Sequence, residues 1–280
     1  MDARIDLHTH SNCSDGVLSP DALVQLAATR QLQLLALTDH DTVAGCAAAR
    51  SACTAHSIRF VPGIELTAEW REREIHVVGL AVDVDSPALR NQIDTVGELR
   101  RQRIRAIGER LDRHGLPGSE LATQALAAAS PTRMHMARLL VGTGACADTE
   151  QAFDKLLKRG RPGYVPARWP QLADTVACLH EAGGIAVLAH PHRYQLSNGQ
   201  LRELCAQFRL AGGGGIEVSL SGMSPADAER AASLARRFDL AGSIGSDFHE
   251  PGLPWRPLGR FAKLPDGVTP ITGQLMQRMS

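Results

Sequence analysis

The sequence predicts an α/β fold in which a closed or nearly closed (β/α) barrel carries a mostly helical insertion. Short apolar runs alternate with helical patterns over residues 1–86 and again over residues 170–280. Residues 87–169, in contrast, show helical patterns without an obvious strand. A chain of 280 residues is long enough for a barrel with an insertion. We therefore expect a barrel domain of residues 1–86 and 170–280, and an inserted domain of residues 87–169.

The first part of the barrel region alternates strands with helices. A strand is expected at residues 4–8, and a helix follows with Ser19 as its N-cap and Pro20 at its first position. Residues 32–38 are almost continuously apolar, as in a parallel strand that is covered on both faces. An alanine-rich helix near residues 43–55 comes next, followed by strands at residues 58–66 and 74–80.

The middle of the chain differs from the barrel in both pattern and charge. Residues 88–114 read as one long helix, and residues 116–158 supply further helical pattern broken by prolines and glycines. Between residues 100 and 168 there are 13 basic and 6 acidic residues, a net charge of +7 in a chain that is neutral as a whole. The insertion is therefore basic and the barrel acidic. The simplest expectation for the arginines between Arg100 and Arg113 is a solvated helix face.

Strand and helix patterns resume after Pro170 and continue to about residue 246. Helices are expected at residues 171–182, 200–211 and 225–238, and strands at residues 185–190, 215–219 and 240–246. Together with the first part of the chain, this gives around seven strands with parallel-type connections. Such a series favours a barrel over an open sheet.

Composition restricts the classes of partner and the cellular location. With 30 basic and 30 acidic residues there is no global positive field to hold a long nucleic acid, so a small substrate is favoured. Six cysteines without a C-x-x-C pair predict reduced, mostly buried thiols rather than disulfides or a thiolate zinc site. The sequence starts without a signal pattern and has no apolar run near the roughly 18 residues of a membrane span, so we expect a cytoplasmic protein without membrane contact or an obligate protein partner.

Histidines and carboxylates gather where the predicted strands end. His8 and His10 are two residues apart on an extended chain, so both imidazoles can face one cation. In barrel enzymes functional groups collect at the carboxyl ends of the strands, which favours a metal centre built from all these side chains. The candidate metal ligands are His8, His10, Asp15, His40, Glu65, His76, His190, Asp247 and His249.

Several neighbouring polar residues have other expected roles. Asp39 precedes a helix and is either an N-cap or a partner that orients an imidazole, whereas Asp41 is expected to be solvated. His192 is a candidate for transferring a proton during catalysis. Ordinary positions on helix surfaces are expected for His56, His114 and His180.

The donor types indicate which cations the centre would hold. Imidazole and carboxylate without thiolate suit Mn²⁺, Fe²⁺ or Zn²⁺, and abundant carboxylates favour manganese or iron. Nine candidate ligands exceed the needs of one cation, so two or three divalent metal ions are expected, with Glu65 as a candidate bridge. Such a cluster polarises a phosphoryl group and generates hydroxide from bound water, which predicts hydrolysis. The residues that we assign to catalysis are His8, His10, Glu65 and Asp247.

Taken in order, these motifs resemble the PHP (polymerase and histidinol phosphatase) family. The resemblance implies a distorted (β/α)₇ barrel with a trinuclear metal centre. It also implies that one metal is held by His8, His10, Glu65 and Asp247, a second by Glu65, His76 and His190, and a third by Asp15, His40 and His249. The matching segments are His8-Thr9-His10, Thr38-Asp39-His40, Gly63-Ile64-Glu65, His76, Ala189-His190-Pro191 and Ser246-Asp247-Phe248-His249.

Within that family, the insertion resembles the subgroup of 3',5'-nucleotide bisphosphate phosphatases and related 5'-to-3' exoribonucleases. The segments that carry this likeness are residues 132–138 and 161–166. A basic lid above an acidic metal site suits a doubly phosphorylated ligand, because one phosphate can meet the metals while cationic side chains clamp the other. The candidates for this substrate clamp are Arg133, His135, Lys158, Tyr164 and Arg193.

The expected activity is removal of the 3'-phosphate from a nucleoside 3',5'-bisphosphate such as pAp. A small phosphorylated nucleotide would then be the substrate, and a nucleoside 5'-monophosphate and phosphate the products. The first alternative is 5'-to-3' exoribonuclease activity on short 5'-phosphorylated RNA. Two further alternatives are histidinol phosphatase, whose cationic substrate a lid of charge +7 would repel, and a non-catalytic accessory domain.

Overall fold

Seven strands form a nearly closed barrel in the computed structural model, which describes residues 4–253 and 255–279. The strands lie side by side in sequence order. Leu7 N donates to Ile244 O over 3.2 Å, and Thr9 forms a parallel bridge with Phe248, so the last strand returns to the first. The strands are β1 (Ile5–Asp6), β2 (Leu34–Leu37), β3 (Arg59–Trp70), β4 (Arg73–Leu80), β5 (Ile185–Leu188), β6 (Gly215–Leu220) and β7 (Ala241–Gly245).

One strand runs against the others, which corrects the expectation of parallel-type connections throughout. Strand β4 is antiparallel to both β3 and β5. The cause is the two-residue connection Arg71-Glu72, in which both residues have positive φ values of 49° and 58°. Two positive φ angles in a two-residue loop match the twist of a β-hairpin, and a hairpin is necessarily antiparallel. Strand β3 therefore extends four residues beyond its expected end at Leu66 and pairs with β4 along its length.

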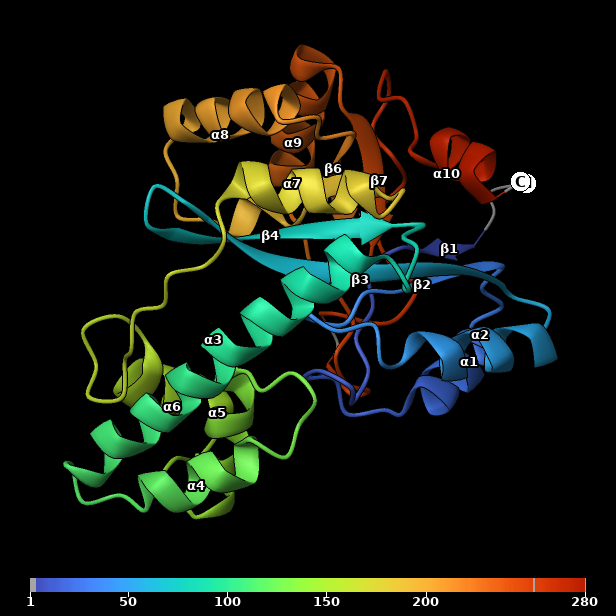
Figure 1. Cartoon of the computed structure of the whole chain (residues 1–280). Helices are drawn as coiled ribbons and strands as arrows, with labels where there is room; N and C mark the ends of the chain where they lie inside the picture. The colour runs from blue at the N-terminus through green and yellow to red at the C-terminus, as the bar shows by residue number, and fades with distance from the viewer. Residues whose placement is uncertain (1–3, 254, 280) are drawn as a thin grey trace.

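Helices cover the outside of the barrel in two groups (Figure 1). Helices α1 (Pro20–Thr29) and α2 (Cys46–Ala55) pack against β2 and β3 through one apolar cluster. The second group packs against β3 to β6 through the largest cluster and comprises α7 (Leu172–Glu181), α8 (Asn198–Leu210) and α9 (Pro225–Phe238). As expected, Ser19 caps α1 by accepting from Ala22 N. A final helix, α10 (Thr272–Met279), was not predicted.

The amino-terminal end of the barrel is filled with apolar side chains. Leu34, Val61, Leu80 and Ile185 belong to one buried cluster there, and Leu275 of α10 adds to it. Since close-packed apolar side chains leave no room for polar groups, functional side chains are confined to the opposite, carboxyl-terminal end of the strands.

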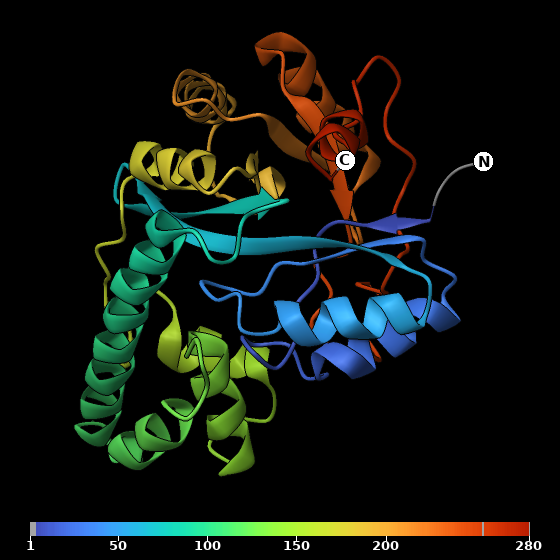
Figure 2. The ribbon, with the colours of Figure 1, turned by 45° about the vertical axis from the view of Figure 1, so that its right-hand side comes forward.

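Residues 87–157 form a helical unit that projects from the barrel. It consists of α3 (Pro87–Asp112), α4 (Gly118–Ala125), α5 (Arg133–Gly142), α6 (Thr149–Ala152) and a π-helical turn, η1 (Phe153–Leu157). Its own core includes Ile107, Leu111 and Met136. Figure 2 shows α3 leading away from the sheet with the other helices packed beside it. We call residues 87–169 the helical insertion; its limits as a domain and its role as a lid stay predictions.

Two expectations from composition can be compared with the structure. All six cysteines are free, five of them buried and Cys13 partly buried, which agrees with the predicted thiols. In the described residues, no helix combines the length and apolar character needed to cross a membrane.

Candidate metal centre

The structure brings all nine candidate ligands together at the carboxyl-terminal end of the barrel. His8 and His10 follow β1, His40 follows β2, and Glu65 and His76 lie within β3 and β4. The others, His190, Asp247 and His249, follow β5 and β7, and Asp15 lies in the loop before α1. The side chains of His8, His10 and Glu65 are fully buried. Burying so many ionisable groups is costly unless they are paired or bind a cation, which indicates a functional cluster.

Glu65 occupies the middle of this cluster. Its Oε1 atom lies 3.1 Å from His76 Nδ1 and 2.9 Å from His190 Nε2. Its Oε2 atom lies 2.9 Å from His40 Nδ1 and 3.3 Å from His10 Nε2. The two carboxylate oxygens thus face different groups of histidines, which is the geometry that a carboxylate bridging two cations requires.

His8, His10 and Asp247 form the group around the first expected metal. His8 Nε2 and His10 Nε2 are 3.0 Å apart, and both lie close to Asp247 Oδ1, at 3.4 and 3.2 Å. Ligand atoms of His8, His10 and Glu65 all lie within 4.8 Å of one another. Asp247 adopts a positive φ of 51°, a conformation uncommon for a residue other than glycine, which turns its side chain toward the histidines.

Asp15, His40 and His249 gather around a second point. Asp15 Oδ1 lies 3.2 Å from His249 Nε2 and 3.8 Å from His40 Nε2, and His10 joins this group within 4.8 Å. His249 Nδ1 donates to the carbonyl oxygen of Asp247 over 3.0 Å, so Nε2 is the ring nitrogen that faces Asp15. A third group consists of His40, Glu65 and His76.

The unpaired atoms in the centre fit divalent cations. Five buried atoms of the candidate ligands have no hydrogen-bond partner: His10 Nδ1, Asp15 Oδ1, His40 Nδ1, Glu65 Oε2 and His190 Nδ1. Those of Asp15, His40 and Glu65 face other candidate ligands. Nitrogen and oxygen lone pairs left without donors suit cations such as Mn²⁺, Fe²⁺ or Zn²⁺. His10 and His40 each belong to two of the three groups, so the division of ligands among three metals stays a prediction.

Burial and neighbouring charges determine the protonation of the histidines. Burial lowers the pKa of His10 to about 3, with help from nearby His249, and burial likewise lowers the pKa of His190 to about 4. Burial also lowers the pKa of His76, but the carboxylates of Glu65 and Glu74 outweigh it and raise that pKa to about 10. His10 and His190 are therefore neutral at pH 7, the form in which imidazole binds a metal.

The structure also reveals polar partners that the sequence analysis missed. Glu217 on β6 accepts from His8 Nδ1 over 2.6 Å and is buried. Arg138 donates to the carbonyl oxygen of Asp15 over 2.7 Å, and Arg256 lies 3.5 Å from Asp247 Oδ2. Glu217 is the charged residue of the strand segment 215–220, and this was the sequence signal that could have revealed it. Arg138 lies in the segment 132–138 noted above, but no local pattern indicated that it contacts Asp15, and none marked Arg256, because both partners are distant in sequence.

Two expectations about neighbouring aspartates are resolved. Asp39 accepts hydrogen bonds from Ser11 N, Ser11 Oγ and Ser14 Oγ, so it organises the loop that leads to Asp15 rather than capping the helix. The expectation that Asp41 is solvated was wrong. Asp41 is 2% exposed, and its carboxylate accepts from Thr67 and from Arg100 of α3.

Three arginines of the helical insertion approach the centre. Two of them, Arg100 and Arg103, are exceptions to the expected solvated helix face, which holds for Arg105, Arg110 and Arg113. Arg100 and Arg103 are buried, at 7% and 8% exposure. Together with Arg133 they line a cavity of about 140 Å³ that also touches Asp15, His40 and His76. Arg103 and Arg133 share the carboxylate of Glu74, at 3.0 and 3.2 Å. The cavity therefore joins candidate metal ligands to guanidinium groups.

The other clamp candidates lie in different surroundings. Arg193 pairs with Asp247, and so reaches the centre. His135 Nδ1 accepts from Thr132 N in a capping box at the start of α5. Lys158 is exposed and pairs with Asp154, and Tyr164 lines a separate cavity of about 230 Å³ with Glu69 and Glu72. The roles of all five in binding substrate stay predictions.

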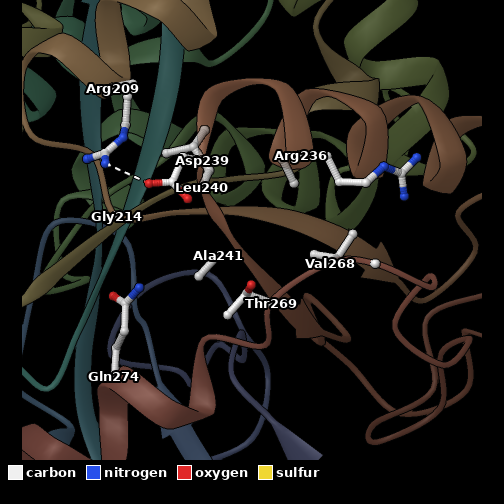
Figure 3. A pocket seen from close by; sticks show the side chains of 11 residues that line it. Arg209, Gly214, Arg236, Asp239, Leu240, Ala241, Val268, Thr269 and Gln274 are labelled. Atoms are coloured by element: carbon white, nitrogen blue, oxygen red, sulfur yellow. Dashed lines mark hydrogen bonds and ion pairs between the residues drawn. The ribbon is translucent and has the colours of Figure 1, made fainter.

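A larger cavity lies at the other end of the barrel and has a different character. It measures about 430 Å³ and is lined by residues of α8, α9 and β7 together with Gln274 of α10. Figure 3 shows Arg209 and Asp239 facing one another across it; they form an ion pair at 3.2 Å. None of the nine candidate ligands lines this cavity, and the centre described above remains the site with the chemistry of a hydrolase.

The barrel and its centre define a hydrolase of the metal-dependent phosphoesterase class, and comparison with known proteins agrees. The sequence profile of the PHP domain matches residues 6–159, and the chain belongs to the PHP family. It is 42% identical over 266 residues to the 5'-3' exoribonuclease Rnm of Salmonella typhimurium, covering 94% of this chain and 90% of that protein. It is 39% identical over 279 residues to the 3',5'-nucleoside bisphosphate phosphatase of Chromobacterium violaceum, covering 99% and 98%.

Solved structures show the same likeness across the whole fold. An amidohydrolase from Chromobacterium violaceum, solved with bound sulfate and no metal, superposes with a TM-score of 0.93 at 39% identity, covering 99% of this chain and 97% of that one. A protein from Bifidobacterium adolescentis gives a TM-score of 0.82 at 27% identity, covering 98% and 96%. The expected resemblance to the PHP family and to its bisphosphate phosphatase and exoribonuclease subgroup is confirmed.

Proposed function

We propose that this protein removes the 3'-phosphate of nucleoside 3',5'-bisphosphates such as pAp, giving a nucleoside 5'-monophosphate and inorganic phosphate. The observation that carries the proposal is the 140 Å³ cavity in which Asp15, His40 and His76 meet Arg100, Arg103 and Arg133. A cavity lined by both candidate metal ligands and guanidinium groups suits a ligand with two separate phosphates.

The nine donors would hold two or three divalent metal ions, and the donor set favours Mn²⁺. Bound there, such ions supply polarisation of a phosphoryl oxygen and activation of water near neutral pH. His8, His10, Glu65 and Asp247 would fix the position of the reacting phosphate. Arg193, which contacts Asp247, lies where it can donate to the oxygens of that phosphate.

The second phosphate would be bound by the insertion. Arg103 and Arg133 share one carboxylate, Glu74, which leaves the pair with a net positive charge. Guanidinium groups donate two hydrogen bonds to one phosphate, so Arg133 at the rim of the cavity suits the 5'-phosphate. Arg100 already donates hydrogen bonds to Asp41 and Thr67, so we assign it to the wall of the cavity rather than to phosphate binding.

The alternative is stepwise 5'-to-3' degradation of short 5'-phosphorylated RNA. The likeness to the exoribonucleases of Salmonella typhimurium and Haemophilus influenzae, at 42% and 39% identity, favours it as strongly as the likeness to the phosphatase favours pAp. Chemically the two activities are close, because both break the phosphate ester at the 3'-oxygen of a nucleotide that carries a 5'-phosphate. The substrate is then a small nucleotide or a short oligonucleotide; a cytoplasmic location stays a prediction.

The two activities are separated by a panel of substrates under identical conditions. Protein loaded with Mn²⁺ is incubated with pAp, a short 5'-phosphorylated RNA and histidinol phosphate, and phosphate and mononucleotide are quantified. Efficient phosphate release from pAp with slow turnover of RNA supports the bisphosphate phosphatase. Comparable release of mononucleotides from RNA would replace it with the exonuclease, and preferential turnover of histidinol phosphate would refute both.

A further inference from the structure

Glu217 is a buried carboxylate that contacts two candidate ligands at once. It lies on β6, is 1% exposed, and stands where the pairing of β6 with β7 shifts register between Glu217 and Ser219. Its Oε1 atom lies 2.6 Å from His8 Nδ1, and its Oε2 atom accepts from His190 N over 2.5 Å. Such an irregularity redirects a side chain within a strand, and here the redirected side chain reaches the floor of the metal centre.

We propose that Glu217 is a positioning residue on which metal binding by both His8 and His190 depends. The two histidines follow different strands, β1 and β5, and face different oxygens of Glu65. The Glu217 carboxylate thus contacts two residues, His8 and His190, that are expected to bind two different metals. The proposal goes beyond the proposed function because it concerns how cations are held, whichever phosphate ester is cleaved.

At His8 the carboxylate selects the tautomer. Both Glu217 oxygens are engaged with nitrogens, and a carboxylate can only accept hydrogen bonds. The proton of neutral His8 is therefore on Nδ1, and the Nε2 lone pair is free. That Nε2 atom lies 3.4 Å from Glu65 Oε2 and 3.4 Å from Asp247 Oδ1, in the group expected to hold a cation. Fixing the tautomer removes the cost of shifting a proton when the metal binds.

At His190 the same carboxylate stabilises an unusual backbone. His190 has φ 28° and ψ 57°, a positive φ that costs free energy in a residue other than glycine. The hydrogen bond from His190 N to Glu217 helps to hold this conformation. The result is that His190 Nε2 lies 2.9 Å from Glu65 Oε1. Without this hydrogen bond the positive-φ conformation of His190 would be less stable, and the imidazole would be held less firmly beside Glu65.

An amide cannot replace this carboxylate, although it has the same size. Glutamine offers one acceptor and one donor group, whereas His8 Nδ1–H and His190 N–H are both donors. If the amide oxygen faces His190 N, the NH₂ group faces His8 Nδ1 and forces the proton to Nε2, where the metal should bind. If the oxygen faces His8, the NH₂ group opposes His190 N–H. Either orientation weakens one of the two ligands.

The test measures metal binding directly. Glu217→Gln and wild-type protein are stripped with a chelator and dialysed against a series of Mn²⁺ concentrations, and bound manganese per chain is measured by elemental analysis. We expect the variant to bind at least one Mn²⁺ about 10–100-fold more weakly. The matched control is Glu69→Gln, another buried glutamate on a barrel strand, whose partner is Arg168; its Mn²⁺ binding should equal that of wild type.

Unchanged Mn²⁺ binding by Glu217→Gln would overturn the proposal, as would an equal loss in Glu69→Gln. Circular dichroism of the metal-free proteins checks that the variants fold. If Glu217→Gln does not fold, nitrogen NMR of wild-type protein loaded with Zn²⁺ tests the proposed tautomer of His8 instead. His8 is expected to carry its proton on Nδ1, and a proton on Nε2 would contradict the account. Because none of these readouts involves a substrate, a failure here is distinct from a failure of the proposed phosphatase activity.

Discussion

Arg100 of α3 donates from Nε to Asp41 Oδ2 over 2.7 Å, and Asp41 directly follows the candidate ligand His40. The same guanidinium donates to Thr67 Oγ1 over 2.8 Å. Asp41 in turn accepts from Thr67 N over 2.7 Å, and its φ is 48°. The helical insertion is thus joined to the candidate metal centre by a buried, hydrogen-bonded ion pair.

Replacing Arg100 by methionine should strongly destabilise the protein, because Asp41 would remain buried without its charged partner. Removing one member of a buried pair costs about 3–5 kcal/mol. We expect a loss of that order in the free energy of unfolding measured by urea denaturation. The double variant Arg100→Met/Asp41→Asn removes the stranded charge, so it should be more stable than the single variant. A double variant less stable than Arg100→Met would contradict this explanation.

Substitution Arg133→Ala tests the expected clamp for the second phosphate. Losing a hydrogen bond to a charged group costs about 1.5–3 kcal/mol, equivalent to roughly 10–100-fold in kcat/KM for pAp. Phosphate release from 3'-AMP, which lacks the 5'-phosphate, should change little. Arg209→Ala is the matched control, since Arg209 pairs with Asp239 at the other end of the barrel. Equal losses on pAp and 3'-AMP would show that Arg133 does not contact the 5'-phosphate.

Removing bound metal should lower the thermal stability of the protein. A cation that binds only the folded state at 100 times its Kd adds about 2.7 kcal/mol, which raises Tm by roughly 5 °C in a chain of this size. Calorimetry of chelator-treated protein, before and after adding Mn²⁺, measures this shift. The same Tm with and without Mn²⁺, in protein shown to be folded, would argue against a cation at the nine ligands.

Asp6 should make stability depend on pH in the acid range. Burial raises the pKa of Asp6 from 3.8 to about 6, against the opposing hydrogen bonds from Ser246, Gly259 and His8. The folded state therefore binds this proton more tightly than the unfolded state, and stability falls as pH rises from about 4 to about 6. The pKa difference corresponds to about 3 kcal/mol.

The new side chain in the Asp6→Asn variant cannot ionise, so the variant loses this pH dependence of stability. Its amide NH₂ group also lowers stability by an amount that does not change with pH, because the site supplies only hydrogen-bond donors. The stability advantage of wild type over Asp6→Asn should shrink between pH 4 and pH 6. Chemical denaturation of the metal-free proteins at several pH values gives this difference. An advantage that is constant or grows over that range would mean that Asp6 does not have a raised pKa.

The sequence was sufficient to predict which nine side chains the fold brings together, because their positions follow from local rules. His8, His40 and Asp247 stand where apolar strands end, and strand ends of a barrel meet at one rim. The β3–β4 hairpin was missed since Arg71-Glu72 forms its turn without the glycine or asparagine that usually marks one. Asp41 and Glu217 were misjudged or overlooked because their partners, Arg100, His8 and His190, lie far along the chain.

Phosphate release from pAp during stepwise metal loading is the most direct test of the central claim, that the nine ligands form a metal-dependent phosphoesterase centre. Metal-free protein receives increasing equivalents of Mn²⁺, and phosphate and AMP are measured together with bound metal. We predict no release from the metal-free protein, and equal amounts of phosphate and AMP that increase until two or three Mn²⁺ are bound. Hydrolysis without metal, or metal-loaded protein that hydrolyses neither pAp nor short 5'-phosphorylated RNA, would contradict the account.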